Sequence, residues 1–388
     1  LNAEMTTVVQ ENIAGVRVVK GFAMEHDEIA KFHRKKEDFL GSLLSTVRFW
    51  AVRVPLAQFV YGLSVPLALW VGGQAVIRES LSLGALVTVI FLLMGLGWRI
   101  AMIGQFTNII QTASASAERI LGIIDEEPAI TSGSRPFPPG GGAVEFENVS
   151  FSYGPGSPVL HNISFKVRPG ERIAVVGPTG AGKSSLLGLI PRFHDPTSGR
   201  LLIDGVDVRE LDLKSLRRNV GVIFQETFLF AMTVAENIAY GDPGASRERI
   251  IHAAQLACAH EFIEQLPDGY DTVIGERGVS LSGGQRQRIA IARALLLNPR
   301  ILILDDATAA VDALTERAIR DAIERASVGR TVFIIAQRLA TVRQTDRILV
   351  MNEGTIVAIG SHDELLRQEG FYRTIAQDFL SDAPGRVA

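Results

Sequence analysis

Two long uncharged stretches constrain this chain more than any other feature of its sequence. Residues 54–77 carry no charged side chain over 24 positions, and residues 80–98 carry none over another 19. A helix of about 20 apolar residues crosses the ~30 Å hydrocarbon core of a bilayer, because each residue advances it by ~1.5 Å. We therefore expect transmembrane helices at about 54–77 and 80–103; the alternative is a pair of buried helices in a large soluble core.

The distribution of basic residues favours the membrane interpretation. Five basic side chains lie within the 20 positions before the first stretch (Arg34, Lys35, Lys36, Arg48 and Arg53), whereas the turn at 78–80 carries a single arginine. Because basic residues concentrate on the cytosolic side of a membrane, both ends of the hairpin should face the cytosol. Pro55 and Pro66 should kink the first helix, which membranes tolerate. The sequence thus predicts a multi-pass protein of the cell (plasma or inner) membrane, with its remaining residues cytosolic.

The overall composition excludes several other classes of protein. Hydrophobic residues make up 47% of the 388 positions, which excludes a disordered chain. The 39 basic and 42 acidic residues give a net charge of −3, so no basic field points to nucleic acid as a partner. Cys258 is the single cysteine, and it can form neither an intrachain disulfide nor a Cys-based zinc cluster.

A change of composition divides the chain. Residues 126–142 hold four prolines and four glycines, and we predict a linker there between a membrane part (1–125) and a second domain (143–380), followed by a tail (381–388). In the second domain, short apolar strands alternate with helical segments, which predicts an α/β fold with a largely parallel sheet. The expected strands are 172–177, 301–305, 331–336 and 347–351. The chain opens with Leu1 inside a helical pattern, so we expect a piece of a longer protein.

A glycine-rich loop follows the first of these strands. Residues 177–184 satisfy the phosphate-loop (P-loop) pattern G-x-x-x-x-G-K-[ST], in which backbone N–H groups surround phosphate oxygens. Lys183 should neutralise the β and γ phosphates of ATP, while Ser184 and the strand-ending Asp305 should hold Mg²⁺. The predicted nucleotide-binding residues are Gly177, Pro178, Thr179, Gly180, Ala181, Gly182, Lys183, Ser184 and Ser185.

The segment Leu281-Ser282-Gly283-Gly284-Gln285 narrows the choice among P-loop proteins, because it resembles the signature of ABC-family ATPases. This resemblance extends over the whole chain. It implies that Ser282, Gly283, Gly284 and Gln285 act on ATP held by a partner subunit. It also implies that Tyr153 stacks on adenine and that Gln225 binds at the nucleotide site, where it senses Mg²⁺ and contacts the membrane domain. Residues 275–278 resemble the exporter segment that touches the coupling helices, although Val273 stands where exporters usually have Glu.

The membrane part is similar to the last third of an exporter's six-helix domain. Residues 15–22 resemble the second intracellular loop, whose short coupling helix docks on the partner's ATPase domain. The two spans would then be the fifth and sixth helices, and residues 113–125 would lead into the linker. The expected architecture is therefore an α-helical membrane-domain fragment joined to an α/β P-loop ABC ATPase domain.

Two departures from the family pattern concern the chemistry of hydrolysis. Asp306 stands where the family has its catalytic Glu, and Gln337 stands where it has the switch His. Aspartate loses on the order of 1.5 Å of reach, and a misplacement of ~1 Å can cost ~100-fold in rate. Gln337 cannot carry the positive charge of a histidine. Residues 309–312 read Ala-Ala-Val-Asp in place of Ser-Ala-Leu-Asp, which keeps the aspartate.

These departures predict the degenerate-site subunit of a heterodimeric ABC exporter: its own site binds ATP and hydrolyses it slowly, while its signature completes the partner's site. A homodimer with two slow sites and an ATP-gated regulatory or channel subunit are the alternatives. A soluble DNA-repair ATPase is disfavoured by the membrane hairpin and by the lack of a long coiled-coil insertion. The mostly apolar spans suit an amphipathic drug or lipid as the exported substrate.

Overall fold

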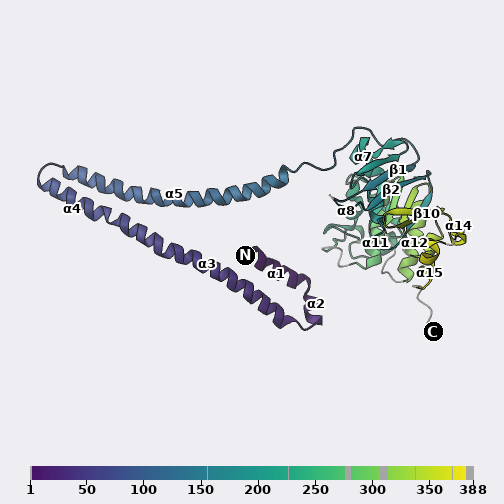
Figure 1. The fold of residues 1–388 in the computed structure, drawn as a ribbon, viewed down its shortest axis with the longest axis horizontal. Helices are drawn as coiled ribbons and strands as arrows, with labels where there is room; N and C mark the ends of the chain where they lie inside the picture. Colours follow the sequence, from purple (N-terminus) through teal and green to yellow (C-terminus); the bar gives the residue numbers. More distant parts are fainter. Residues whose placement is uncertain are drawn as a thin grey trace. The chain divides into compact units, whose positions relative to one another are not determined.

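The chain folds into two units, which Figure 1 shows. In this computed structural model, residues 2–154, 156–225, 227–275, 281–305, 313–336, 338–368 and 370–381 are described. The first unit is Leu1–Glu127 and the second is Pro128–Ala388.

The first unit is entirely helical. Its helices are α1 (Asn2–Ala14), α2 (Val16–Gly21), α3 (Glu25–Gly62), α4 (Ser64–Ile77) and α5 (Leu83–Ile124). Helix α1 packs against α3, and α4 packs against α5. The short helix α2 occupies the position predicted for a coupling helix at 15–22. Its neighbour Phe22 is 76% exposed, so this end of the unit presents an apolar surface.

The interruption between α3 and α4 has a local cause. Pro66 has no backbone N–H, so the carbonyl of Gly62 lacks its partner in the helical hydrogen-bond pattern. The helix is thus interrupted at Leu63, whereas Pro55, also expected to kink it, lies inside the continuous helix α3. Within the described ranges, the segment Glu25–Ile77 is long and apolar enough to cross a membrane, and Leu83–Leu96 is a shorter apolar part of helix α5. Helix α5 begins at Leu83 rather than at 80, because the Ser82 side chain caps it by accepting from the Ala85 N–H at 3.2 Å.

The second unit contains two sheets. Its strands are β1 (Val144–Phe151), β2 (Leu160–Val167), β3 (Arg172–Val176), β4 (Ser198–Ile203), β5 (Val206–Asp207), β6 (Val220–Ile223), β7 (Ile301–Asp305), β8 (Thr331–Ile335), β9 (Arg347–Asn352) and β10 (Thr355–Gly360). One sheet has the order β2-β1-β4-β5 and is antiparallel. The other has the order β10-β9-β3-β8-β7-β6 and is parallel except for the edge strand β10. The predicted α/β fold and its four named strands are confirmed as β3, β7, β8 and β9.

Burial on both faces explains the parallel strands. All five residues of β8 are buried, as are the first four of β7. Alternate side chains of β7 enter two separate hydrophobic clusters: Leu302 and Leu304 belong to one, and Ile301 and Ile303 to the other. A strand between two cores reads as a continuous apolar run rather than as an alternating one.

Helices make up much of the rest of the second unit. They are α6 (Lys183–Gly188), α7 (Leu213–Asn219), α8 (Val234–Ile238), α9 (Arg247–Leu256), α10 (His260–Glu264), α11 (Gly283–Leu296), α12 (Ala313–Ser327), α13 (Leu339–Val342), α14 (His362–Arg367) and α15 (Phe371–Ser381). Short 3-10 turns lie at Val208–Glu210, Ala239–Gly241 and Gly269–Asp271. Helix α11 packs on β6 and against α8, α9 and α12.

Much of the segment predicted as a linker is bonded to the second unit. The Gly133 N–H donates to the Leu211 carbonyl at 3.0 Å, and the Arg135 N–H donates to the Glu210 carbonyl at 2.9 Å. Further along, the Ala143 N–H donates to the Asp204 carboxylate at 2.8 Å. The proline- and glycine-rich composition therefore marks an extended segment that lies along this unit rather than a free connection.

Candidate functional site

The phosphate loop joins β3 to α6 at the carboxyl edge of the parallel sheet. Strand β3 lies between β9 and β8, so the loop that follows it projects from the middle of this edge. Ligands of open α/β sheets bind at such edges. The residues predicted from the P-loop pattern therefore occupy one loop and one helix start, as expected.

Two glycines of the phosphate loop, Gly177 and Gly180, differ in how much space a Cβ would have. Gly177 has φ +155°, and a Cβ there would lie 2.2 Å from the Met351 carbonyl oxygen. Gly180 has φ +84° with open space around it. The Lys183 ammonium donates to the carbonyls of Gly177 and Pro178, both at 2.8 Å, so it lies inside the curve of the loop. Tight backbone curvature around an ammonium fits the binding of the phosphates of ATP.

The residues predicted to hold Mg²⁺ also lie together. Burial raises the pKa of Asp305, and a hydrogen bond with Ser184 and the positive charge of Lys183 oppose this effect. A hydroxyl and a carboxylate are the hard oxygen ligands that Mg²⁺ takes, with phosphates and water completing its shell. No group of three or more His, Cys, Asp or Glu residues that could hold a metal occurs in the described residues. The Ser184 hydroxyl and the Asp305 carboxylate thus fit a Mg²⁺ ion that binds together with a nucleotide.

Gln225 lies at the same edge of the sheet. It follows β6, which pairs with β7 so that Ile223 is opposite Leu304, the residue before Asp305. Its side chain is exposed. This placement agrees with the expected role of Gln225 near Mg²⁺, which remains a prediction.

Tyr153 follows β1 and is 63% exposed. Its ring contacts the rings of Phe151 and His194, with centroids at 4.8 and 5.1 Å. Its hydroxyl forms a hydrogen bond with the Ser185 hydroxyl on α6 at 2.9 Å. An exposed ring tied to the phosphate-loop helix can stack on a nucleotide base, which is the role that we predict for Tyr153.

The signature residues form the start of α11. The Ser282 side chain accepts from the Gln285 N–H at 3.2 Å, and the Ser282 N–H donates to the Gln285 side chain at 2.9 Å. This reciprocal pair is a capping box. Gly283 is exposed and Gly284 is buried. Sequence reasoning assigned Ser282 and Gln285 to the partner's nucleotide and missed that they also cap this helix.

Several predicted positions lie outside the described residues. They are Asp306, residues 309–312, Gln337 and residues 276–278. Asp306 directly follows β7, and Gln337 comes two residues after the end of β8. Their expected effect on hydrolysis therefore remains a prediction.

Comparison with known proteins identifies the family. Residues 160–309 match the model of the ABC transporter family, and residues 1–100 match that of the ABC transporter transmembrane region. A solved bacterial Atm1-family ABC exporter with ATP bound is 33% identical, with a TM-score of 0.87 over 99% of this chain and 67% of that one. The chain belongs to the ABC transporter family. The ABC family predicted from residues 281–285 and the exporter type predicted from the membrane part are thereby confirmed.

Similar curated proteins include other ABC transporters. An ATP-dependent lipid A-core flippase of Syntrophus aciditrophicus is 44% identical over 384 residues, which are 98% of this ABC transporter chain. The uncharacterized ABC transporter ATP-binding protein YknU of Bacillus subtilis is 43% identical over 376 residues, or 96% of the chain. This chain spans 64% of the length of each of these relatives.

His194 is a residue of this ABC transporter that sequence reasoning missed. It contacts Tyr153 although 40 positions separate the two in the chain. No motif includes it, and a lone exposed histidine carries no signal of such a contact. A link of this kind becomes visible only when the loop after α6 is placed beside the end of β1.

Proposed function

We propose that this chain is the ATP-binding and membrane subunit of an ABC exporter that couples ATP binding and hydrolysis to the export of an amphipathic lipid-type or drug-type substrate. The phosphate-loop geometry and the contact of Ser184 with Asp305 support nucleotide binding with Mg²⁺. The mostly apolar helices and the relatives named as lipid A-core flippases support a lipid-like cargo.

One observation carries the proposal of an asymmetric exporter: Asp306 and Gln337 replace two residues of the same chemical step. The glutamate of the family polarises the attacking water, and aspartate falls short of it by about one methylene. A neutral glutamine stabilises the developing phosphate charge less than a protonated histidine does. The site built on Lys183 should therefore hold ATP and turn it over slowly.

The signature of this chain would serve the other site. Ser282, Gly283, Gly284 and Gln285 match the family pattern without change. We propose that they contact ATP held by a second half-transporter with an intact catalytic Glu and His. The working enzyme would then be a heterodimeric ATPase in the cell membrane, with both ATPase domains cytosolic.

The test compares steady-state ATPase activity of the full-length subunit alone with that of the mixed dimer. We expect the isolated subunit to bind MgATP but to hydrolyse it far more slowly per site. The double variant Asp306→Glu with Gln337→His should raise its turnover, whereas Asp306→Glu with Gln337→Ala should not reach the same rate. Equal turnover per site in the isolated subunit and the mixed dimer would contradict the proposal that this chain's own site is the slow one.

The same assay separates the alternatives. A homodimer with two slow sites would show the same low turnover with or without a partner, and it would still transport. An ATP-gated regulatory subunit would bind ATP with no added turnover even beside its partner.

A further inference from the structure

We propose that His194 is a positioning residue that orients the Tyr153 ring for stacking on the adenine of ATP. The proposal rests on the proposed function, since it takes the phosphate loop as a nucleotide site. Its subject is the base rather than the phosphates.

Three rings contact one another at the end of β1. Phe151 is 2% exposed and anchors the group in the core. The Tyr153 ring meets Phe151 at an interplanar angle of 76° and His194 at 85°. Phe151 and His194 are themselves 5.3 Å apart. Edge-to-face pairs of this kind favour one ring orientation. Because Tyr153 is otherwise exposed, these two rings and the Ser185 hydroxyl determine where its face points.

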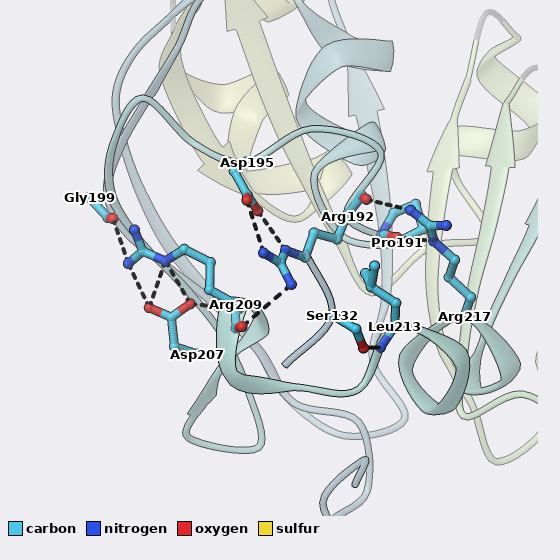
Figure 2. A network of polar contacts seen from close by, with 9 residues as sticks. All are labelled: Ser132, Pro191, Arg192, Asp195, Gly199, Asp207, Arg209, Leu213 and Arg217. Atoms are coloured by element: carbon cyan, nitrogen blue, oxygen red, sulfur yellow. Dashed lines mark hydrogen bonds and ion pairs between the residues drawn. The ribbon is translucent and has the colours of Figure 1, made fainter. Parts of the chain in front are cut away.

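Residues on both sides of His194 in the sequence are held by polar contacts, and Figure 2 shows those of Arg192, Asp195 and Arg217. The Arg192 side chain is only 4% exposed and donates twice to the Asp195 carboxylate, at 2.6 and 3.0 Å. The Arg217 guanidinium donates to the carbonyls of Pro191 and Arg192, at 3.1 and 2.8 Å. A two-pronged ion pair with a buried guanidinium holds its loop more firmly than a single contact between two exposed side chains does. His194 therefore stands on a fixed stretch of backbone.

The same loop is bonded to the strand end that precedes Tyr153. The Ser152 N–H donates to the Thr197 hydroxyl at 3.1 Å, and the Thr197 N–H donates to the Ser150 carbonyl at 2.9 Å. These bonds fix the separation of the two backbones. The contact between the His194 and Tyr153 rings is thus set by these backbone hydrogen bonds and does not depend on two freely moving side chains.

A ring that is already held in one orientation strengthens base stacking, because the binding of ATP does not have to order it. Loss of the His194 ring would leave Tyr153 held on one side by Phe151 and at its tip by Ser185. The ring would then occupy several orientations, and only some would suit the base. None of these rings belongs to the phosphate loop, in which the Lys183 ammonium donates to the carbonyls of Gly177 and Pro178.

The experiment measures binding of MgATP and of Mg-tripolyphosphate to the whole chain in detergent by isothermal titration calorimetry. Tripolyphosphate reports on the phosphate loop without the base. We expect His194→Ala to weaken MgATP binding by roughly two- to tenfold, the range of an aromatic pair, and to leave tripolyphosphate binding unchanged. His194→Phe should restore the affinity for MgATP. His252→Ala, at an exposed histidine of α9, is the matched control and should bind as the unchanged chain does.

The outcomes separate this inference from the proposed function. Unchanged MgATP affinity in His194→Ala would overturn the positioning role alone, as would an equal loss for tripolyphosphate, which would mean a disturbed phosphate loop. Failure of His194→Phe to restore MgATP affinity would also overturn it. If the unchanged chain binds neither MgATP nor tripolyphosphate, the proposed function falls and this inference falls with it.

Discussion

Replacing Gly177 with alanine should damage the nucleotide site more than the same change at Gly180. A Cβ at Gly177 would lie 2.2 Å from the Met351 carbonyl oxygen, whereas an ordinary contact begins at 3.4 Å. To remove this overlap of about 1 Å the backbone must move, because the contact atom is a carbonyl oxygen of β9. That strand is held against β3 by pairing, with Val350 opposite Val176. A side-chain rotation cannot relieve this clash.

The magnitude follows from two contributions. Overpacking typically costs about 1–3 kcal/mol, and a left-handed backbone costs a residue with a Cβ about 1–2 kcal/mol. Gly180→Ala has only the second cost, because nothing lies within 4 Å of its Cβ position. At roughly 2–4 °C per kcal/mol for a unit of this size, Gly177→Ala should lower the melting temperature of the ATPase unit by about 10 °C, and Gly180→Ala by roughly half of that or less.

Thermal unfolding in detergent, followed by circular dichroism, measures both variants, and titration with MgATP reports on the loop. Gly244→Ala is the control, since its Cβ meets open space without a left-handed φ. We expect MgATP affinity to fall further for Gly177→Ala than for Gly180→Ala. Equal losses in both variants would refute the reasoning, because the approach to Met351 would then have no consequence.

Three further predictions address other parts of the chain. Burial and the charge of Arg343 lower the pKa of His362, whose Nε2 accepts from the Arg343 guanidinium at 3.2 Å. Because the pKa of His362 is lower in the folded than in the unfolded chain, its contribution to stability is present above the unfolded pKa of about 6.5 and is lost as pH falls through the folded pKa. The melting temperature should therefore fall on acidification, and it should fall less in His362→Phe. Ser282→Arg should nearly abolish ATPase activity of the mixed dimer, whereas Asp306→Asn should cost little; equal damage would make Asp306 a working catalytic base. Tyr153→Ala should weaken MgATP binding by ~1–2 kcal/mol, and calorimetry that finds no change would return Tyr153 to ordinary packing.

The sequence predicted the parts of the fold that depend on local pattern. Strands β7 and β8 are continuous apolar runs between two cores, so their burial is visible in their composition. The phosphate loop is equally local, since its glycines and Lys183 are consecutive.

Features that depend on distant pairing were not predicted. The antiparallel sheet β2-β1-β4-β5 is one example, because β1 pairs with β4 across more than 40 positions and with a register shift between Glu147 and Ser150. The contact of His194 with Tyr153 is another. The course of residues 133–143 along the second unit is a third, since its bonds join backbone groups whose partners lie far along the chain. Proline and glycine content predicts the lack of regular structure there but not what the segment contacts.

The position of β3 between β8 and β9 also constrains how the protein is made. The Arg172 N–H bonds to the Asp346 side chain, 174 positions later in the chain. At about 5–20 residues per second, the ribosome needs on the order of 10–35 s to reach Asp346 after Arg172 has been added. For most of that interval neither β8 nor β9 has been made, so a nascent chain exposes an unpaired apolar strand and has no finished nucleotide site. Binding of ATP during synthesis should therefore begin only after β9 has left the ribosome, and the interval before it is when this domain most needs a chaperone.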